Sequence, residues 1–336
     1  MKLLWSYLRF AFFFTFLTLA GVTGWTLQNH SSLGTALLVV SALTLLEIAI
    51  SFDNAVVNVT VLRDMEPAWQ HRFLTWGIWI AVFGMRFLFP ILIVSWVTQL
   101  GPWEAGILAL QNPEEYARIM HSVRSEVNAF GGSFLALVAL KYFIDHEKDE
   151  HWLAPLERPL SLVGRVESTQ VGVVLLILFF VTRGFEAGEG FRILLAGVGG
   201  VLTWLFVEAL NAVLDQGLIA SVTRTGVGGF IYLEILDASF SFDGVIGALA
   251  LTNQLVLIAA GLGVGAFYVR SLTMFFLEQG TLQKLKYLEH GAFWAVGMLA
   301  GVMFLGIHVH ISEIWIGLLS LAILVSSVWS SLRSVT

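Results

Sequence analysis

The segment Glu47-Ile-Ala-Ile-Ser-Phe-Asp53-Asn54 returns in a related form about 190 residues later, as Asp237-Ala-Ser-Phe-Ser-Phe-Asp243-Gly244. We call these segments motif 1 and motif 2. Each begins with an acid, continues to Ser-Phe-Asp and lies inside a long apolar run. An ionised carboxylate that faces lipid costs at least ~2.5–3.5 kcal/mol, so acids in such runs are functional by default. The pair of motifs predicts the two halves of one cation site in a membrane protein.

The composition is that of a polytopic membrane protein. Hydrophobic residues make up 57% of the chain, charged residues 12%, and the mean hydropathy is +0.82, whereas about a quarter of the residues in soluble domains are charged. The chain has no cysteine, which excludes disulfides and thiolate metal ligands. The net charge of −6 is spread over loops without a basic run, so we expect no nucleic-acid partner.

About ten segments are apolar and long enough to cross the hydrocarbon, which takes ~20 residues per helix. We therefore expect an all-α polytopic fold with a single transmembrane domain over residues 1–336. The first span is expected to be retained, although Leu19-Ala-Gly also offers a signal-peptide cleavage site. Pro90 predicts a kink in the third span. The expected spans are 8–27, 33–62, 73–100, 127–144, 169–183, 190–214, 227–253, 255–277, 290–308 and 313–331.

The distribution of Lys and Arg supports an even number of crossings. With these spans, 12 of the 18 basic residues fall on one side of the membrane and 4 on the other. Because Lys and Arg in short loops stay in the cytoplasm, we expect both termini to be cytoplasmic. The longest loops are expected at 101–126 outside and 145–168 inside.

Two loop segments carry side chains that ligate metals. The inner loop begins Asp145-His-Glu-Lys-Asp-Glu-His151, and a second group lies near the outer end of the ninth span: His308, His310 and Glu313. Each is compatible with a metal ion, but a solvated loop explains such charge as well and is the commoner case.

The two halves of the chain match beyond the motifs. Gly77, Phe83, Arg86 and Leu88 recur in register as Gly261, Phe267, Arg270 and Leu272, and Ala129-Phe130 recurs as Ala292-Phe293. We expect two three-span repeats, 33–144 and 227–308, separated by linker spans at 169–214. Five crossings separate their first spans, so the repeats are expected to have inverted topology, as in many secondary transporters.

Motif 1 carries a polar stripe on an ideal helix, and motif 2 repeats its beginning. The stripe consists of Glu47, Ser51, Asn54 and Asn58, matched by Asp237 and Ser241. Asp53 and Asp243 lie off this stripe. We therefore expect both helices to unwind near Ser-Phe-Asp, where freed backbone carbonyls would add ligands. Unbroken helices would instead assign the first acid of each motif to a proton path or to a second layer around the ion.

Charge within the spans predicts a cation as the ligand. Six acids and two bases give −4 if all ionise: Glu47, Asp53, Glu208, Glu234, Asp237 and Asp243 against Arg86 and Arg270. Carboxylate, amide and hydroxyl oxygens suit magnesium, calcium or manganese(II). Surplus carboxylates would take up protons when the ion is absent, which favours metal–proton exchange.

Other polar residues in the spans receive supporting assignments. The two arginines are expected to be counter-charges for nearby carboxylates. Five residues are expected to line a proton or ion pathway or to form a second layer around the ion: Ser51, Asn58, Glu208, Glu234 and Ser241. For Glu208 a hydrogen bond to a neighbouring helix is equally compatible.

At these residues the sequence resembles the TerC-like integral membrane family, and more closely a related family of bacterial membrane proteins of uncharacterised function. The resemblance lies in Glu47…Phe52-Asp53-Asn54, in Leu233 to Gly244 and in Tyr268-Val-Arg270-Ser-Leu272. It implies an inverted three-plus-three helical core like that of the lysine-exporter superfamily. It also implies manganese efflux, known for several members, or tellurium resistance, after which some are named. The metal positions it implies are Glu47, Asp53, Asn54, Asp237 and Asp243.

One position departs from the TerC-like pattern. Gly244 stands where many members carry a Ser after the aspartate, so one hydroxyl ligand is missing from motif 2.

We therefore expect a divalent-cation transporter in the bacterial cytoplasmic membrane, with the resemblance favouring manganese(II) export. The ion is cargo and no cofactor is required; lipid is the other partner, and a homo-oligomer is compatible with the sequence. The alternative is a membrane stress or tellurium-resistance accessory protein without transport activity, whose acids only hold helices together. We do not expect an enzyme, because no nucleophile–base constellation is present.

Overall fold

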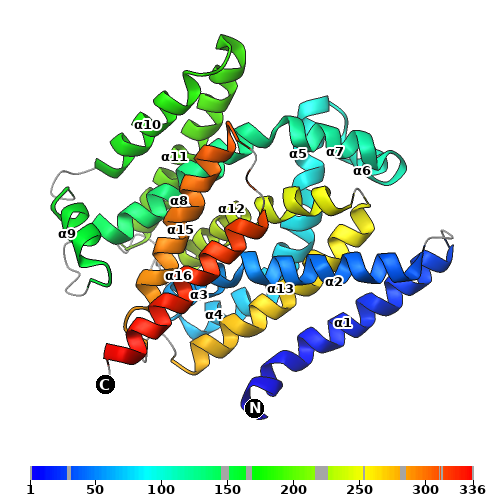
Figure 1. The fold of residues 1–336 in the computed structure, drawn as a ribbon, viewed down its shortest axis with the longest axis horizontal. Coiled ribbons are helices and arrows are strands. Elements are labelled where there is room, and N and C mark those ends of the chain that lie inside the picture. The colour runs from blue at the N-terminus through cyan, green and yellow to red at the C-terminus, as the bar shows by residue number, and fades with distance from the viewer. Residues whose placement is uncertain are drawn as a thin grey trace.

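The computed structural model describes residues 2–28, 32–144, 151–163, 169–215, 226–252, 254–280, 285–309, 311 and 313–334. Within these ranges the chain forms helices and no strand (Figure 1). The α-helices are α1 (Lys2–Gln28), α2 (Leu33–Ile50), α3 (Phe52–Leu62), α4 (Pro67–Arg72), α5 (Phe89–Thr98), α6 (Pro102–Gln111), α7 (Pro113–Ser122), α8 (Arg124–Ile144), α9 (Ala154–Val163), α10 (Thr169–Thr182), α11 (Ala187–Asp215), α12 (Val227–Leu251), α13 (Leu255–Glu278), α15 (Leu288–Gly306) and α16 (Glu313–Ser334). The π-helical segments are η1 (Phe73–Gly77) and η2 (Ile80–Leu88).

Local signals explain several helix starts. Pro67, Pro102 and Pro113 begin α4, α6 and α7, where the missing backbone N–H of proline costs nothing. Asn112 caps α7 by accepting a hydrogen bond from the backbone N–H of Glu115 at 3.3 Å. The long apolar runs are helical because a helix satisfies its backbone hydrogen bonds internally, which lipid requires.

In the part of the chain that the structure describes, six helices are long and apolar enough to cross a membrane. They are Tyr7–Leu27, Arg124–Ile144, Gly188–Ala209, Leu255–Glu278, Leu288–Gly306 and Trp315–Ser334. Two shorter apolar helices, Leu33–Ile48 and Thr169–Thr182, lie at other expected spans. The structure therefore supports a helical, multi-pass membrane protein, while the full count of ten spans stays a prediction.

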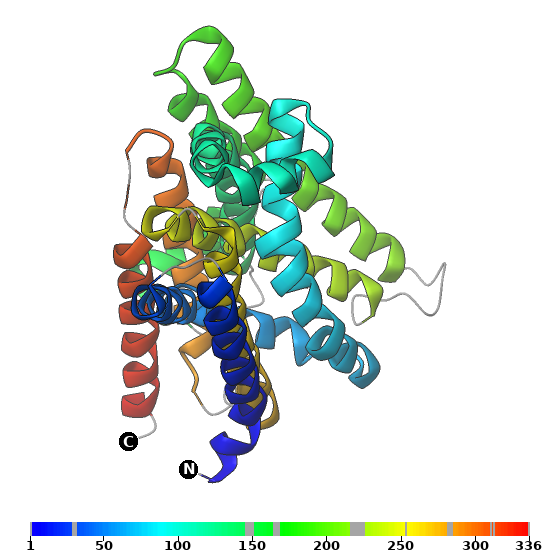
Figure 2. The same cartoon turned by 90° about the vertical axis from the view of Figure 1, so that its right-hand side faces the viewer.

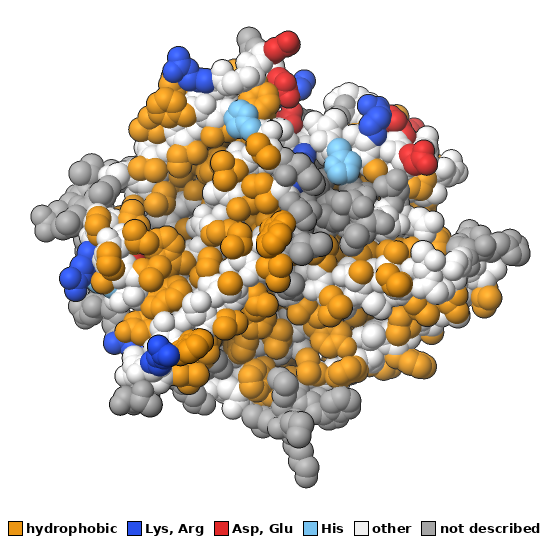
Figure 3. Space-filling model, in the orientation of Figure 1, with side chains coloured by type: hydrophobic (Ala, Val, Ile, Leu, Met, Phe, Trp, Pro, Cys, Tyr) orange, Lys and Arg blue, Asp and Glu red, His pale blue; other side chains and the backbone are white. Residues whose placement is uncertain are grey.

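Apolar side chains cover much of the surface of these helices. Phe16, Phe180, Phe206 and Trp329 are each more than half exposed. On the face in Figure 3, hydrophobic side chains spread across the middle, whereas Lys, Arg, Asp and Glu gather toward the edges. Exposed apolar area on this scale marks an interaction surface, and for helices of this length the matching environment is lipid.

The helices pack in two groups that share α3 and α16. In one group, α1, α2 and α13 pack against one another; in the other, α8 packs against α10, α11 and α15 (Figures 1 and 2). Both α3 and α16 contact α15 as well as members of the first group. The helix that carries motif 2, α12, contacts α2, α3, α13 and η2. This packing brings the two motifs together at the centre of the molecule.

The motif helices differ in their continuity. Motif 1 is interrupted, because α2 ends at Ile50, α3 begins at Phe52, and Ser51 between them has φ −95° and ψ 11°. Motif 2 lies within the continuous helix α12. The predicted unwinding therefore occurs in motif 1 and is wrong for motif 2. No proline occurs at 240–245, so every residue there keeps the N–H that a helix needs, and a glycine inside a helix costs only about 1 kcal/mol.

The region of the third predicted span changes its winding along its length. The π-helical segments η1 and η2 lead into α5, whose first turn contains Pro90. The change from π- to α-helical winding thus lies next to the proline from which a kink was predicted. The two predicted long loops are partly helical, since 101–126 contains α6 and α7, and 145–168 contains α9.

Candidate functional site

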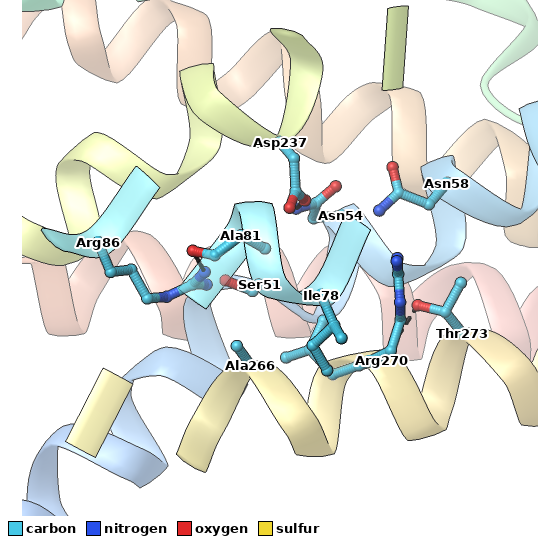
Figure 4. Close-up of a pocket in the computed structure, with 11 residues that line it drawn as sticks. Ser51, Asn54, Asn58, Ile78, Ala81, Arg86, Asp237, Ala266, Arg270 and Thr273 are labelled. Atoms are coloured by element: carbon cyan, nitrogen blue, oxygen red, sulfur yellow. Dashed lines mark hydrogen bonds between the residues drawn. The ribbon is translucent and has the colours of Figure 1, made fainter. Parts of the chain in front are cut away.

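A small polar cavity lies where both motif helices meet η2 and α13 (Figure 4). Its volume of about 20 Å³ is enough for a water molecule or a bare ion. Its lining consists of Ser51, Asn54, Asn58, Ile78, Ala81, Arg86, Asp237, Ala266, Val269, Arg270 and Thr273. Six of these residues are candidates from the sequence, drawn from both halves of the chain: Ser51, Asn54, Asn58, Arg86, Asp237 and Arg270.

Two contacts cross between the motifs in a reciprocal way. Nδ2 of Asn54, the last residue of motif 1, donates a hydrogen bond of 2.5 Å to Oδ1 of Asp237, the first residue of motif 2. Conversely, a methyl carbon on Gly244, the last residue of motif 2, would lie 3.0 Å from Oε2 of Glu47, the first residue of motif 1. Each motif therefore places its last residue against the first acid of the other.

Glu47 is fully buried and held by its surroundings. Its Oε1 atom forms an ion pair with Arg86 and accepts a hydrogen bond of 2.8 Å from Oγ of Ser51. Arg86 also donates from Nη1 to the carbonyl oxygen of Ala81 at 2.7 Å. A methyl carbon on Gly265 would lie 2.5 Å from Cβ and Cγ of Glu47, so the glycine permits close packing of α13 on α2. One oxygen of this predicted metal ligand is thus committed to a guanidinium and a hydroxyl.

Arg270 is buried in a different setting. Its guanidinium carbon lies 3.9 Å from the ring centroid of Phe73, a cation–π contact. Among the described side chains, its Nε and Nη2 atoms have no hydrogen-bond partner, and the same holds for both carboxylate oxygens of Glu234. A methyl carbon on Gly77 would lie 2.6 Å from Nη2 of Arg270 and 2.7 Å from Oε1 of Glu234. Both charged groups therefore occupy the gap that this glycine leaves.

Three predicted site residues have side chains outside the described part of the structure: Asp53, Ser241 and Asp243. Their backbones place Asp53 in the first turn of α3 and the other two within α12. Among the side chains that are described, no group of three or more His, Asp or Glu is arranged to hold a metal ion. The ligand set predicted from the sequence therefore stays a prediction.

Glu208 does not line the cavity. Its Oε2 atom forms an ion pair with Nζ of Lys141, on the neighbouring helix α8. Of the two interpretations left open for Glu208, the structure supports the contact with a neighbouring helix. Its partner Lys141 was not anticipated, because nothing in the sequence pattern sets α8 beside α11.

Sequence reasoning also missed Thr273, which lines the cavity. It follows Arg270 by three residues on α13, so it lies on the same helix face. The spacing of three residues from Arg270, the arginine matched between the two halves, was the signal that could have identified Thr273. The apolar lining residues carried no such signal.

The loop segments with metal-ligating residues lie away from the cavity. Nε2 of His308 contacts the carbonyl oxygen of Val181 at 2.9 Å, while His310, the side chain of Glu313 and residues 145–150 lie outside the described structure. His151 is near a carboxylate missed from the sequence, since its Nδ1 lies 3.4 Å from Oε2 of buried Glu157. Nε1 of Trp294 donates to the same carboxylate at 3.0 Å, which joins the region of α9 to α15.

Comparison with known proteins relates most of the chain to a described family. A family model described as "Protein of unknown function (DUF475)" matches residues 52–335. No curated protein and no solved structure matches the chain significantly. The family match begins just after the interruption at Ser51 and includes motif 2.

Proposed function

The chain belongs to the DUF475 family of proteins of unknown function, and from this premise we propose that it transports a divalent cation across a membrane. The observation that carries the proposal is the reciprocal contact of the motifs, Asn54 with Asp237 and Gly244 with Glu47. A two-fold relation between the motifs produces this pattern, in which each end of one segment meets the opposite end of the other. A cation site between two inverted repeats is the arrangement on which many secondary transporters are built.

The oxygen donors of the cavity suit a hard cation; of the two arginines that also line it, Arg86 is already paired with Glu47. Oxygen atoms are available from the carboxylate of Asp237, the amides of Asn54 and Asn58, and the hydroxyls of Ser51 and Thr273. Such donors suit magnesium, calcium and manganese(II). Oδ1 of Asn58 is buried without a hydrogen-bond partner among the described side chains, and an amide oxygen in this state is suited to accept a cation or its water.

The backbone supports the same site. Helix ends leave carbonyl and N–H groups outside the regular hydrogen-bond ladder. The helix α2 ends at Ile50, and the next residue, Ser51, lines the cavity. In membrane proteins, interrupted backbone is tolerated where it lines a cavity or is buried in protein. We assign the interruption in motif 1 to ion coordination, together with the aspartates of both motifs.

Glu47 takes a supporting role in this proposal. Because Arg86 and Ser51 occupy one of its oxygens, it acts as a fixed partner that positions η2 against α2. Asp237 accepts its hydrogen bond from a neutral amide instead. Although α12 is continuous through motif 2, Asp237 lines the cavity, and we therefore assign it to the ion and not to a proton path. The carboxylates that hold the cargo are then Asp237, Asp53 and Asp243, and protons replace the ion on Asp53 and Asp243 when it leaves.

We propose manganese as the cargo, its export, and a place in the bacterial cytoplasmic membrane from the resemblance of the motifs to TerC-like proteins. We propose cytoplasmic termini from the distribution of Lys and Arg in the loops. A membrane accessory protein without transport activity is the competing account. It predicts that changes to the acids lower stability without any metal phenotype.

A tolerance assay in manganese-sensitive bacterial cells tests the proposal. Expression of the unchanged chain should restore growth in excess manganese, and Asp53→Ala or Asp243→Ala should abolish this rescue at equal protein level in the membrane. Lys141→Gln is the matched control, because Lys141 is a charged residue of a span that does not line the cavity. Full rescue by both aspartate variants would refute the proposal.

A further inference from the structure

The two arginines that match in sequence register are in different states. Arg86 pairs with Glu47, the first acid of motif 1. Its counterpart Arg270 has two guanidinium nitrogens without a hydrogen-bond partner among the described side chains. Asp237, the counterpart of Glu47, accepts a hydrogen bond from Asn54 instead. The matched acid and arginine therefore form an ion pair in the first half of the chain, which we call closed. In the second half the arginine and the acid have other contacts, and we call this pair open.

The open pair is positioned to close. Asp237 and Arg270 line the same cavity, on α12 and α13, and Figure 4 shows Asp237 entering from one wall and Arg270 from the opposite wall. Arg270 lies over the ring of Phe73 and shares the gap at Gly77 with Glu234 of α12. Its Nε and Nη2 atoms nevertheless have no hydrogen-bond partner among the described side chains, which is unfavourable for a buried charge. A conformation in which the guanidinium of Arg270 forms a hydrogen-bonded ion pair with Asp237 would therefore lower this penalty.

The two motif helices also differ in how far the cavity extends along them. Asn58, 11 residues after Glu47, lines the cavity. Ala248, 11 residues after Asp237, is fully buried in an apolar cluster with Leu43 and Leu262. The cavity thus extends along α3 and is closed at the corresponding position of α12. In alternating access, each conformation of the transporter has one side of the site open and the other closed. Two related halves in opposite states are what such a conformation would show.

We propose that the two ion pairs alternate during the transport cycle. In the conformation described here, Arg86–Glu47 is closed and Asp237 is open to a cation. In the opposite conformation Arg270 binds Asp237 in place of the departed ion, and Arg86 releases Glu47. Each arginine is a tethered cation that substitutes for the cargo in its own half. This inference rests on the proposed transport function, because only a protein that changes its access needs the exchange.

Cysteine labelling can follow the exchange without any transported ion. The chain has no cysteine, so single reporters can be introduced into the full-length protein in nanodiscs. Ala248→Cys reports on the closed end, and Thr273→Cys reports on the cavity of the present conformation. The measured quantity is the rate at which each reporter reacts with a water-soluble maleimide in metal-free buffer.

Opposite effects are expected from removing either pair. Glu47→Gln should favour the opposite conformation, raising the Ala248→Cys rate and lowering the Thr273→Cys rate by about tenfold, a factor equal to about 1.4 kcal/mol. Arg270→Gln removes only the pair of the other conformation, so it should lower the Ala248→Cys rate and should not lower the Thr273→Cys rate. The charge-conserving Glu47→Asp and Arg270→Lys should stay close to the unchanged chain, and they remain informative if a neutral variant fails to fold.

The outcomes separate the two proposals. If both neutral variants raise both labelling rates, the arginines only hold helices together and the alternation is overturned, whether or not manganese flux is measurable. If the reporters shift in opposite directions but reconstituted protein moves no manganese, calcium or magnesium, the alternation stands and the proposed cargo class fails.

Discussion

Asn54 and Asp237, 183 residues apart in the chain, are joined by a hydrogen bond of 2.5 Å between Nδ2 and Oδ1. Through this bond the last residue of motif 1 fixes the first acid of motif 2. Its counterpart is the close approach of Gly244 to Glu47. Because glycine has no side chain to donate, the two halves of the site are chemically unequal although their contacts are reciprocal.

Replacing Asn54 with Ala should destabilise the protein and weaken the site. Asp237 would lose a donor in a largely buried place, which costs about 1–3 kcal/mol. Equilibrium unfolding in mixed detergent micelles measures this loss. Asn58→Ala is the matched control on the same helix, since Oδ1 of Asn58 has no hydrogen-bond partner among the described side chains. An equal or larger loss from Asn58→Ala would contradict the role given to Asn54.

The Arg86–Glu47 pair should show strong coupling in a double-mutant cycle. Each single variant, Glu47→Gln or Arg86→Gln, leaves an uncompensated buried charge at a cost of about 3–5 kcal/mol. The double variant removes both charges and should be less destabilised than the two single losses added together. Unfolding in detergent again gives the free energies.

The partly exposed Lys141–Glu208 pair supplies the comparison for that cycle. Its side chains are 40% and 29% exposed, so its coupling should fall in the range of about 0–1 kcal/mol. Similar coupling free energies in the two pairs would show that burial does not strengthen the interaction of Arg86 with Glu47.

Gly265→Ala should separate α13 from α2. The added methyl carbon would meet Cβ and Cγ of Glu47 at 2.5 Å, so either the helices move apart or the acid leaves Arg86. We expect a lower melting temperature and loss of metal tolerance. Gly301→Ala on α15 is the control, because nothing lies within 4 Å of its added carbon, and alanine there favours the helix by about 0.5–1 kcal/mol. Equal effects of the two changes would contradict the close-packing argument.

Much of the site could be predicted from the sequence because membrane acids and arginines are rare enough for a repeat to stand out. The motifs brought Asn54 and Asp237 forward as candidates, and the wider match between the two halves of the chain brought Arg86 and Arg270. All four line one cavity. Helical spacing within motif 1 likewise selected Ser51 and Asn58, which also line it. These inferences needed only local periodicity and the cost of charge in lipid.

Other features depend on packing that no local pattern encodes. The spacing of six in each motif predicted two interrupted helices, but only α2 ends within its motif. The pairing of Glu208 with Lys141 depends on α8 lying beside α11. The gap at Gly77, filled by Arg270 and Glu234, follows from the contact of η1 and η2 with distant helices.

Manganese(II) flux into proteoliposomes tests the central claim most directly. The account predicts that manganese enters liposomes with the unchanged protein faster than it enters protein-free liposomes. The rate should rise further when the liposome interior is more acidic than the outside, because protons then leave in exchange for the metal. Asp237→Asn should lower the rate at least about tenfold, equivalent to about 1.4 kcal/mol, while Lys141→Gln should preserve it. Flux no faster than in protein-free liposomes for manganese, calcium and magnesium alike, or an unchanged rate with Asp237→Asn, would contradict the account.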